Sequence, residues 1–167
     1  MSRSDPAAAE LDEAVAELRR AGDKAALAVA LRRLGERCRR LPDADGARRH
    51  YEEAVALLRE AGEPLRLAHT VRHLGDVHSE AGRAALAEPC YVEAVTIYRR
   101  HPGTPPLDLA NAVRSLAVLR DDAGEREEAA RLWHEAHDLY EAVGVAAGVA
   151  ECAARLARPD RGGDNGA

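Results

Sequence analysis

The chain has 167 residues, of which 32% are charged, and a net charge of −5. This acidic balance excludes nucleic acid as an expected partner, because binding a phosphate backbone requires a concentrated basic surface. Hydrophobic residues make up 46% of the chain, but aromatic residues make up only 3% and Phe is absent. We therefore expect a core formed by close approach of elements that carry small side chains.

The N-terminal residues MSRSDPAAAE lack the apolar stretch of a signal peptide, and no window approaches a membrane-spanning length of apolar residues. These features predict a cytoplasmic protein with no membrane partner. Residues 1–6 and 158–167 contain little to bury, so both ends are expected to be disordered.

Taken in chain order, the hydrophobic spacing predicts a succession of helices with short connections. The predicted helices cover residues 7–21, 25–40, 44–60, 65–81, 84–100, 106–123, 126–142 and 146–157. Gly or Pro residues stand in the connections, and Asp23 and Asp43 have the position of N-caps. Because no linker interrupts this series, residues 7–157 are predicted to form one domain.

The helices belong to two interleaved series. The stretch LDEAVAELRRAG at residues 11–22 returns as YEEAVALLREAG at residues 51–62, and further copies start at Tyr91 and Trp133. The second series starts at Leu27, Leu67, Leu109 and Val149, with the same intervals of 40 or 42 residues. Two series with one period indicate a two-helix unit repeated along the chain.

Small, large and aromatic residues recur at fixed places in this unit. The matching sets are Leu31, Leu34, Gly35, Ala47, Tyr51 and Ala54, then Val71, Leu74, Gly75, Ala87, Tyr91 and Ala94, then Val113, Leu116, Ala117, Ala129, Trp133 and Ala136. This pattern resembles the tetratricopeptide repeat. The longer period and the phrase AEPCYVEA are similar to the kinesin-light-chain type of that repeat.

The resemblance covers residues 11–157 and implies an all-α fold. It implies a right-handed α-solenoid of antiparallel helix hairpins, with three complete units and a half-unit at each end. It also implies a non-catalytic scaffold that binds an unidentified protein or peptide in a concave groove lined by the first helix of each unit. The Tyr slot departs from the family pattern, since it holds Cys38, His78 and Arg120.

Register alone places three rows in this groove. The rows are Arg32, Arg72 and Arg114; Val29, His69, Asn111 and Glu151; and Glu36, Asp76, Val118 and Arg158. A row of guanidinium groups would suit an acidic segment or a C-terminal carboxylate. The resemblance therefore predicts a peptide-binding groove formed by Arg32, His69, Arg72, Asp76, Asn111 and Arg114.

A structural interpretation of the arginine row stays open beside this one. Arg32 and Arg72 each have an acidic residue four positions later, and such pairs stabilise a helix and occupy the guanidinium. Arg114 has Val118 at that spacing and is the preferred ligand contact among the three.

The two ends of the array suggest a second function. The first and last helices lack the partner helix that would complete a unit, although solenoids normally end in polar capping elements. Apolar residues on these helices could form a homo-oligomer interface, which makes a self-assembling structural module the alternative: Leu11, Val15, Val149 and Leu156. The opposing interpretation is that Ala-rich ends expose too little area, or that the tail folds back over them.

Neither a cofactor nor a metal is predicted. His69 and His73 have a spacing that suits a metal, but no third ligand has that register. His134 and His137 likewise have no third ligand. No orienting group accompanies Cys38 or Cys90, and no phosphate-binding loop or nucleophile elbow is present. The sequence therefore does not predict an enzyme.

Overall fold

The computed structural model describes residues 6–41 and 43–158, with side chains from residue 10 onward, and every regular element in these ranges is a helix. The termini expected to be disordered lie outside the described residues, apart from Pro6 and Arg158. The helices are α1 (Pro6–Ala21), α2 (Lys24–Arg40), α3 (Ala44–Ala61), α4 (Pro64–Glu80), α5 (Ala84–Arg100), α6 (Pro106–Asp122), α7 (Arg126–Ala142) and α8 (Ala146–Leu156). The predicted all-α class and helix positions are confirmed.

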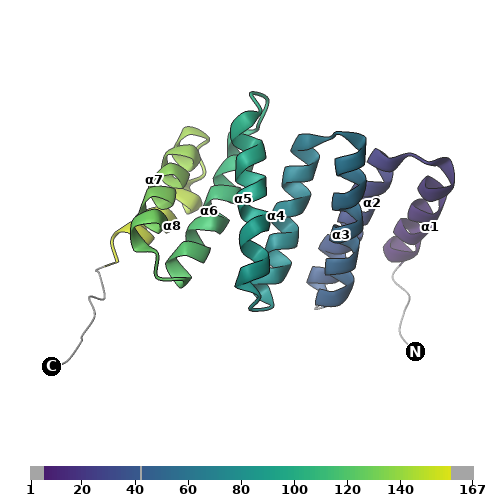
Figure 1. Cartoon of the computed structure of the whole chain (residues 1–167), viewed down its shortest axis with the longest axis horizontal. Helices are drawn as coiled ribbons and strands as arrows, with labels where there is room; N and C mark the ends of the chain where they lie inside the picture. Colours follow the sequence, from purple (N-terminus) through teal and green to yellow (C-terminus); the bar gives the residue numbers. More distant parts are fainter. Residues whose placement is uncertain (1–5, 42, 159–167) are drawn as a thin grey trace. The chain divides into compact units, whose positions relative to one another are not determined.

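The chain forms two compact units, residues 1–104 and 105–167. The first unit contains α1 to α5 and the second contains α6 to α8. Within each unit, helices that follow one another in the chain pack side by side and antiparallel, so each pair forms a hairpin (Figure 1). A single domain over residues 7–157 remains a prediction.

The helix ends follow from local chemistry. The Asp23 carboxylate accepts a hydrogen bond from the backbone N–H of Ala26 at 2.9 Å, and Asp43 accepts one from Gly46 at the same distance. Both are the predicted N-caps, and such caps contribute about 1 kcal/mol each. At the other end of α3, Gly62 adopts a left-handed conformation with φ 68°, which glycine reaches without a steric cost.

In the first unit, tyrosine rings of one helix lie directly on glycines of its partner. A Cβ atom placed on Gly35 would lie 2.9 Å from Cζ of Tyr51, and one on Gly75 would lie 2.7 Å from Cε1 of Tyr91. Both rings are buried, as the repeat pattern predicts. The small residues therefore set how closely α2 approaches α3 and α4 approaches α5.

The second unit is built around a buried tryptophan. The Trp133 indole N–H donates to Asp121 at 3.0 Å, and the guanidinium of Arg155 on α8 lies 5.4 Å from the ring centroid. Tyr140 packs on Gly148, where a Cβ atom would lie 2.5 Å from Cγ of the ring. Both aromatic residues on α7 thus contact α8, and Trp133 also contacts α6.

Ion pairs join the exposed sides of α1, α3 and α5. Arg19 pairs with Glu53 at 2.6 Å, and Arg59 pairs with Glu93 at 2.8 Å, with the same separation along the chain. Because these side chains are exposed, each pair contributes at most about 1 kcal/mol.

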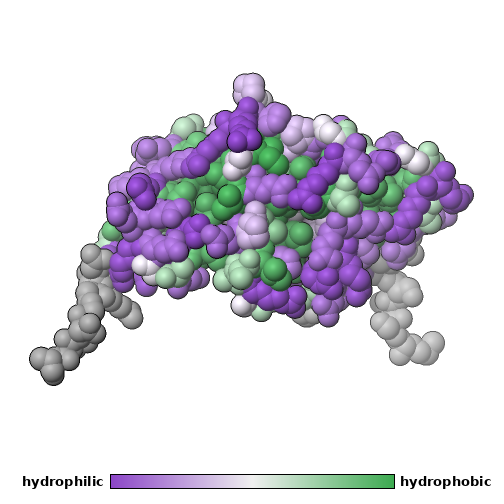
Figure 2. Space-filling view, in the orientation of Figure 1, coloured by the Kyte–Doolittle hydropathy of each residue, from purple (hydrophilic) through white to green (hydrophobic). Residues whose placement is uncertain are grey.

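Hydrophobic residues also reach the visible surface, notably over α5 (Figure 2).

Candidate protein-binding surface

Most of the predicted groove residues of the first unit lie on one surface, which we call the α2/α4 face. It consists of Arg32, Glu36 and Arg39 on α2 and His69, Arg72, His73, Asp76 and Glu80 on α4. The face is only partly open to solvent, since the side chains of Arg72, His73 and Asp76 are 14%, 15% and 16% exposed. Polar groups at this depth need partners.

Asp76 is the central acceptor of this face. Its Oδ2 atom accepts from Arg72 at 3.1 Å and from His73 Nδ1 at 3.2 Å, and its Oδ1 atom accepts from the Tyr91 hydroxyl at 3.1 Å. Arg39 lies 3.5 Å from the same carboxylate. Burial would raise the pKa of Asp76, but the hydrogen bond from His73 and the guanidinium charges outweigh it and lower the pKa.

The three arginines of the α2/α4 face all have acidic partners. Arg32 pairs with Glu36 and Arg72 with Asp76, four residues along the same helix in each case. Arg39 instead crosses from α2 to α4, where its Nε donates to Glu80 at 3.3 Å. The positive charge of this face is therefore balanced within the chain.

His69 differs from these neighbours because it makes no hydrogen bond to any residue that the structure describes. Its ring meets the His73 ring edge to face, with the centroids 4.7 Å apart. Burial, followed by the nearby His73 and Arg72, lowers the pKa of His69 to about 3. The imidazole is therefore neutral at physiological pH and keeps both a donor and an acceptor available.

The second unit presents a smaller equivalent, the α6/α8 face, formed by Asn111, Arg114 and Glu151. Arg114 has no partner four residues later, as the sequence indicates, but Glu151 takes that place through two hydrogen bonds of 2.7 and 2.6 Å. Asn111 accepts a hydrogen bond of 2.8 Å from the Tyr140 hydroxyl. Arg114 is thus no more available to a ligand than Arg32 or Arg72.

Sequence reasoning grouped the face residues by register and missed three of them, Arg39, His73 and Glu80. Arg32, His69, Arg72 and Asp76 come together in the first unit, and Asn111 and Arg114 come together in the second. Arg39 was missed because the equivalent positions of the next two repeats hold Ser79 and Asp121, so Arg39 does not belong to a row of similar residues.

The residues proposed for self-association are more covered than expected. Val15 is buried in a core cluster with residues of α2, and Leu11 packs against the same cluster. Val15 is therefore not part of an exposed apolar end face, because α2 already covers it. Val149 and Leu156 on α8 are partly buried.

Burial raises the pKa of Cys90 to about 11 and also raises the pKa values of Cys38 and Cys152, so these thiols are protonated at neutral pH.

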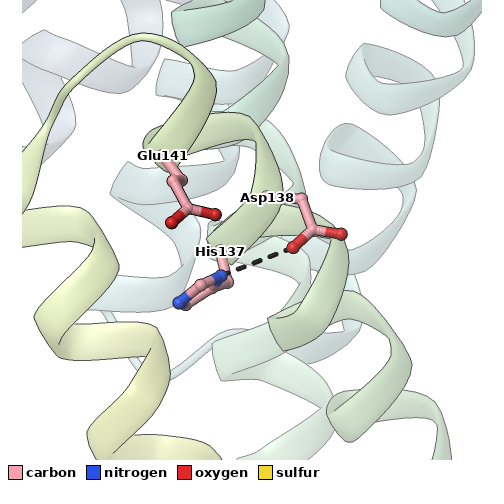
Figure 3. A group of neighbouring side chains, drawn as sticks. All are labelled: His137, Asp138 and Glu141. Carbon is pink, nitrogen blue, oxygen red and sulfur yellow. Dashed lines mark hydrogen bonds and ion pairs between the residues drawn. The ribbon is translucent and has the colours of Figure 1, made fainter.

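His137, Asp138 and Glu141 lie near one another on the last turns of α7 (Figure 3), with their nearest ligand atoms within 4.8 Å. His137 Nδ1 lies 3.4 Å from an Asp138 oxygen, and both carboxylates are exposed to solvent. We interpret this group as a solvated helix surface and assign no metal to it.

Paired antiparallel helices that repeat every 40 or 42 residues define an α-hairpin repeat protein. Residues 27–100 match the family model described as tetratricopeptide repeat, so this part of the chain consists of tetratricopeptide repeats, as its sequence predicts. This repeat is generally a protein-interaction module and is typically non-catalytic.

A similar fold is found in the crystal structure of BtubC (BKLC) from P. vanneervenii, with a TM-score of 0.72 and 19% sequence identity. The match covers 80% of this chain and 55% of that one. No curated protein matches the sequence. Among the described helices, none combines the length and the apolar character that crossing a membrane requires.

Proposed function

We propose that this chain is a non-catalytic, cytoplasmic interaction module that binds a segment of another protein along the α2/α4 face, with the α6/α8 face as a second contact surface. The observation that carries the proposal is His69. It is a neutral, partly buried imidazole without a hydrogen bond to the described chain, on a face where the arginines already have acidic partners. Repeats of this family generally bind proteins.

The balance of charge also bears on the partner. An acidic segment would have to compete with Glu36, Asp76 and Glu80 for the arginines of this face, at a cost in broken ion pairs. We therefore propose a partner that hydrogen-bonds to His69 and packs over the paired charges, in place of one recognised by net negative charge.

The test is affinity capture from an extract of the source organism, followed by mass spectrometry. His69→Ala should reduce recovery of the specific partner at least tenfold, whereas His134→Ala on the exposed side of α7 should leave it unchanged. The exchange Arg32→Glu/Glu36→Arg retains an ion pair at the same spacing, so it should also leave recovery unchanged. Equal recovery by wild type and His69→Ala would refute the proposal.

A further inference from the structure

The outward side of α5 differs from the corresponding sides of α3 and α7. Four positions on each helix share one register, and all but one of the twelve are exposed; the exception, Thr96, is partly buried. The rows are Asp45, Arg49, Glu52 and Ala56 on α3; Ala85, Pro89, Val92 and Thr96 on α5; and Glu127, Arg131, His134 and Asp138 on α7. The α5 row alone carries no ionisable side chain.

This uncharged row adjoins further exposed apolar surface. Leu86 is 50% exposed and Val92 is 40% exposed, which places both among the exposed large hydrophobic residues of the described chain. Hydrophobic residues reach the surface over this helix in Figure 2. Leu86, Pro89 and Val92 lie within two turns of one another, so their side chains can contact one bound segment.

Pro89 adds an open hydrogen-bond acceptor to the row. Helix α5 continues through Pro89, which has no N–H to donate to the carbonyl oxygen of Ala85 four residues earlier. Arg49 and Arg131, at the matching positions of α3 and α7, retain this donor. The Ala85 carbonyl is therefore without its helical hydrogen bond, beside the apolar side chains.

Positive charge lies at both ends of α5. Arg83 precedes the first turn and Arg100 is the last residue, and both are exposed with no ion-pair partner among the described residues. Glu93 is already paired with Arg59. Helix α5 has 17 residues, so these charges stand about 25 Å apart on either side of the apolar row.

We infer that the outward row of α5 is a second docking surface, which takes an amphipathic segment of a partner protein with acidic residues at both of its ends. The apolar side chains of the segment would cover Leu86, Pro89 and Val92, and its carboxylates would pair with Arg83 and Arg100. This inference does not depend on the function proposed for the α2/α4 face.

Charge distinguishes this occupant from a second copy of the chain. Two α5 helices that met through this row would bring Arg83 and Arg100 against like charges in either the parallel or the antiparallel orientation. An anionic membrane is also a poorer match, because the row has no aromatic residue, and Val92 and the adjoining Leu86 are the large apolar side chains exposed on α5.

The test is selection of a phage library that displays random peptides of about 18 residues, long enough as a helix to span the two arginines, on the immobilised full chain. Wild type should enrich sequences with apolar residues at helical spacing and Asp or Glu near both ends. Val92→Glu should reduce this enrichment at least tenfold. The matched control, Ala56→Glu on α3, adds the same charge to the corresponding row and should leave enrichment unchanged. Circular dichroism will establish that both variants are folded.

Three results would overturn the inference. The first is enrichment that Val92→Glu does not reduce, or that lacks acidic residues. The second is a concentration-dependent dimer in sedimentation velocity that Val92→Glu abolishes, which would make a second copy the occupant. The third is co-sedimentation with phosphatidylserine vesicles that Val92→Glu abolishes.

Discussion

The α2/α4 face and the outward row of α5 differ in whether their polar groups are paired. On the α2/α4 face, Asp76 and its neighbours satisfy one another, and one imidazole keeps free hydrogen-bonding capacity. On α5, the row has no charge of its own, an open carbonyl, and at its ends two arginines that form no ion pair with any described residue. A high density of charge therefore does not by itself mark a binding surface, because paired charges are already in use.

The largest effect is expected at Asp76, because its interactions with neighbouring charges stabilise the fold. Asp76→Asn removes the carboxylate charge that Arg72 and Arg39 share, and loss of one partner from a buried pair costs about 3 kcal/mol. Urea unfolding followed by circular dichroism measures this loss. Asp138→Asn, whose side chain is 82% exposed, is the control and should change stability by less than about 0.5 kcal/mol. Equal effects would show that the network is not structural.

A substitution at Pro89, in the α5 row, is expected to increase stability, whereas Asp76→Asn decreases it. Pro89→Ala restores the hydrogen bond from residue 89 to the Ala85 carbonyl, and we expect a gain of about 2 kcal/mol. The same unfolding experiment measures it. If the α5 row is a docking surface, this more stable variant should also bind selected peptides more weakly, because the open acceptor is lost. A stability loss would contradict this explanation of Pro89.

Gly75 tests the packing that supports both surfaces, since it joins α4 to α5. A Cβ atom there would lie 2.7 Å from the Tyr91 ring, so Gly75→Ala should cost about 1–2 kcal/mol through overpacking. Gly103→Ala is the control, because nothing lies within 4 Å of its added Cβ. Differential scanning calorimetry should show a lower Tm for the first variant alone.

The smallest expected effect is the dependence of stability on pH at His69. Its folded pKa, about 3, lies below the unfolded value of 6.5, so the unfolded chain binds the extra proton between these values. Stability therefore falls as pH decreases through this window, by about 0.5 kcal/mol from pH 8 to pH 6 after allowance for solvent at this partly buried ring. His69→Gln should remove this part of the slope in unfolding curves measured across the range. An unchanged slope would show that the ring is more solvated.

The repeat made most of the fold predictable from the sequence. Helices, N-caps and the buried aromatic residues follow from hydrophobic period and from Gly and Asp positions, which are local signals. The grouping of Arg72 with Asp76 follows from helical spacing in the same way. These features required no knowledge of which helices meet.

Contacts between helices were not predictable to the same extent. Arg39 reaches α4 and Glu151 reaches Arg114 across helix pairs, and neither contact has a counterpart at the same register in another repeat. The α5 row was not predicted, because a repeat pattern identifies positions that recur, and this row differs from the matching positions on α3 and α7. The departure became visible only when exposure was known.

Binding of a partner at the α2/α4 face can be tested by placing a photoreactive amino acid at residue 69, and in parallel at residue 52 on the exposed side of α3. Each protein is irradiated in an extract of the source organism, and the adducts are identified by mass spectrometry. We expect a specific protein adduct from residue 69 and none from residue 52. No adduct from residue 69, or the same adducts from both positions, would contradict binding at the α2/α4 face.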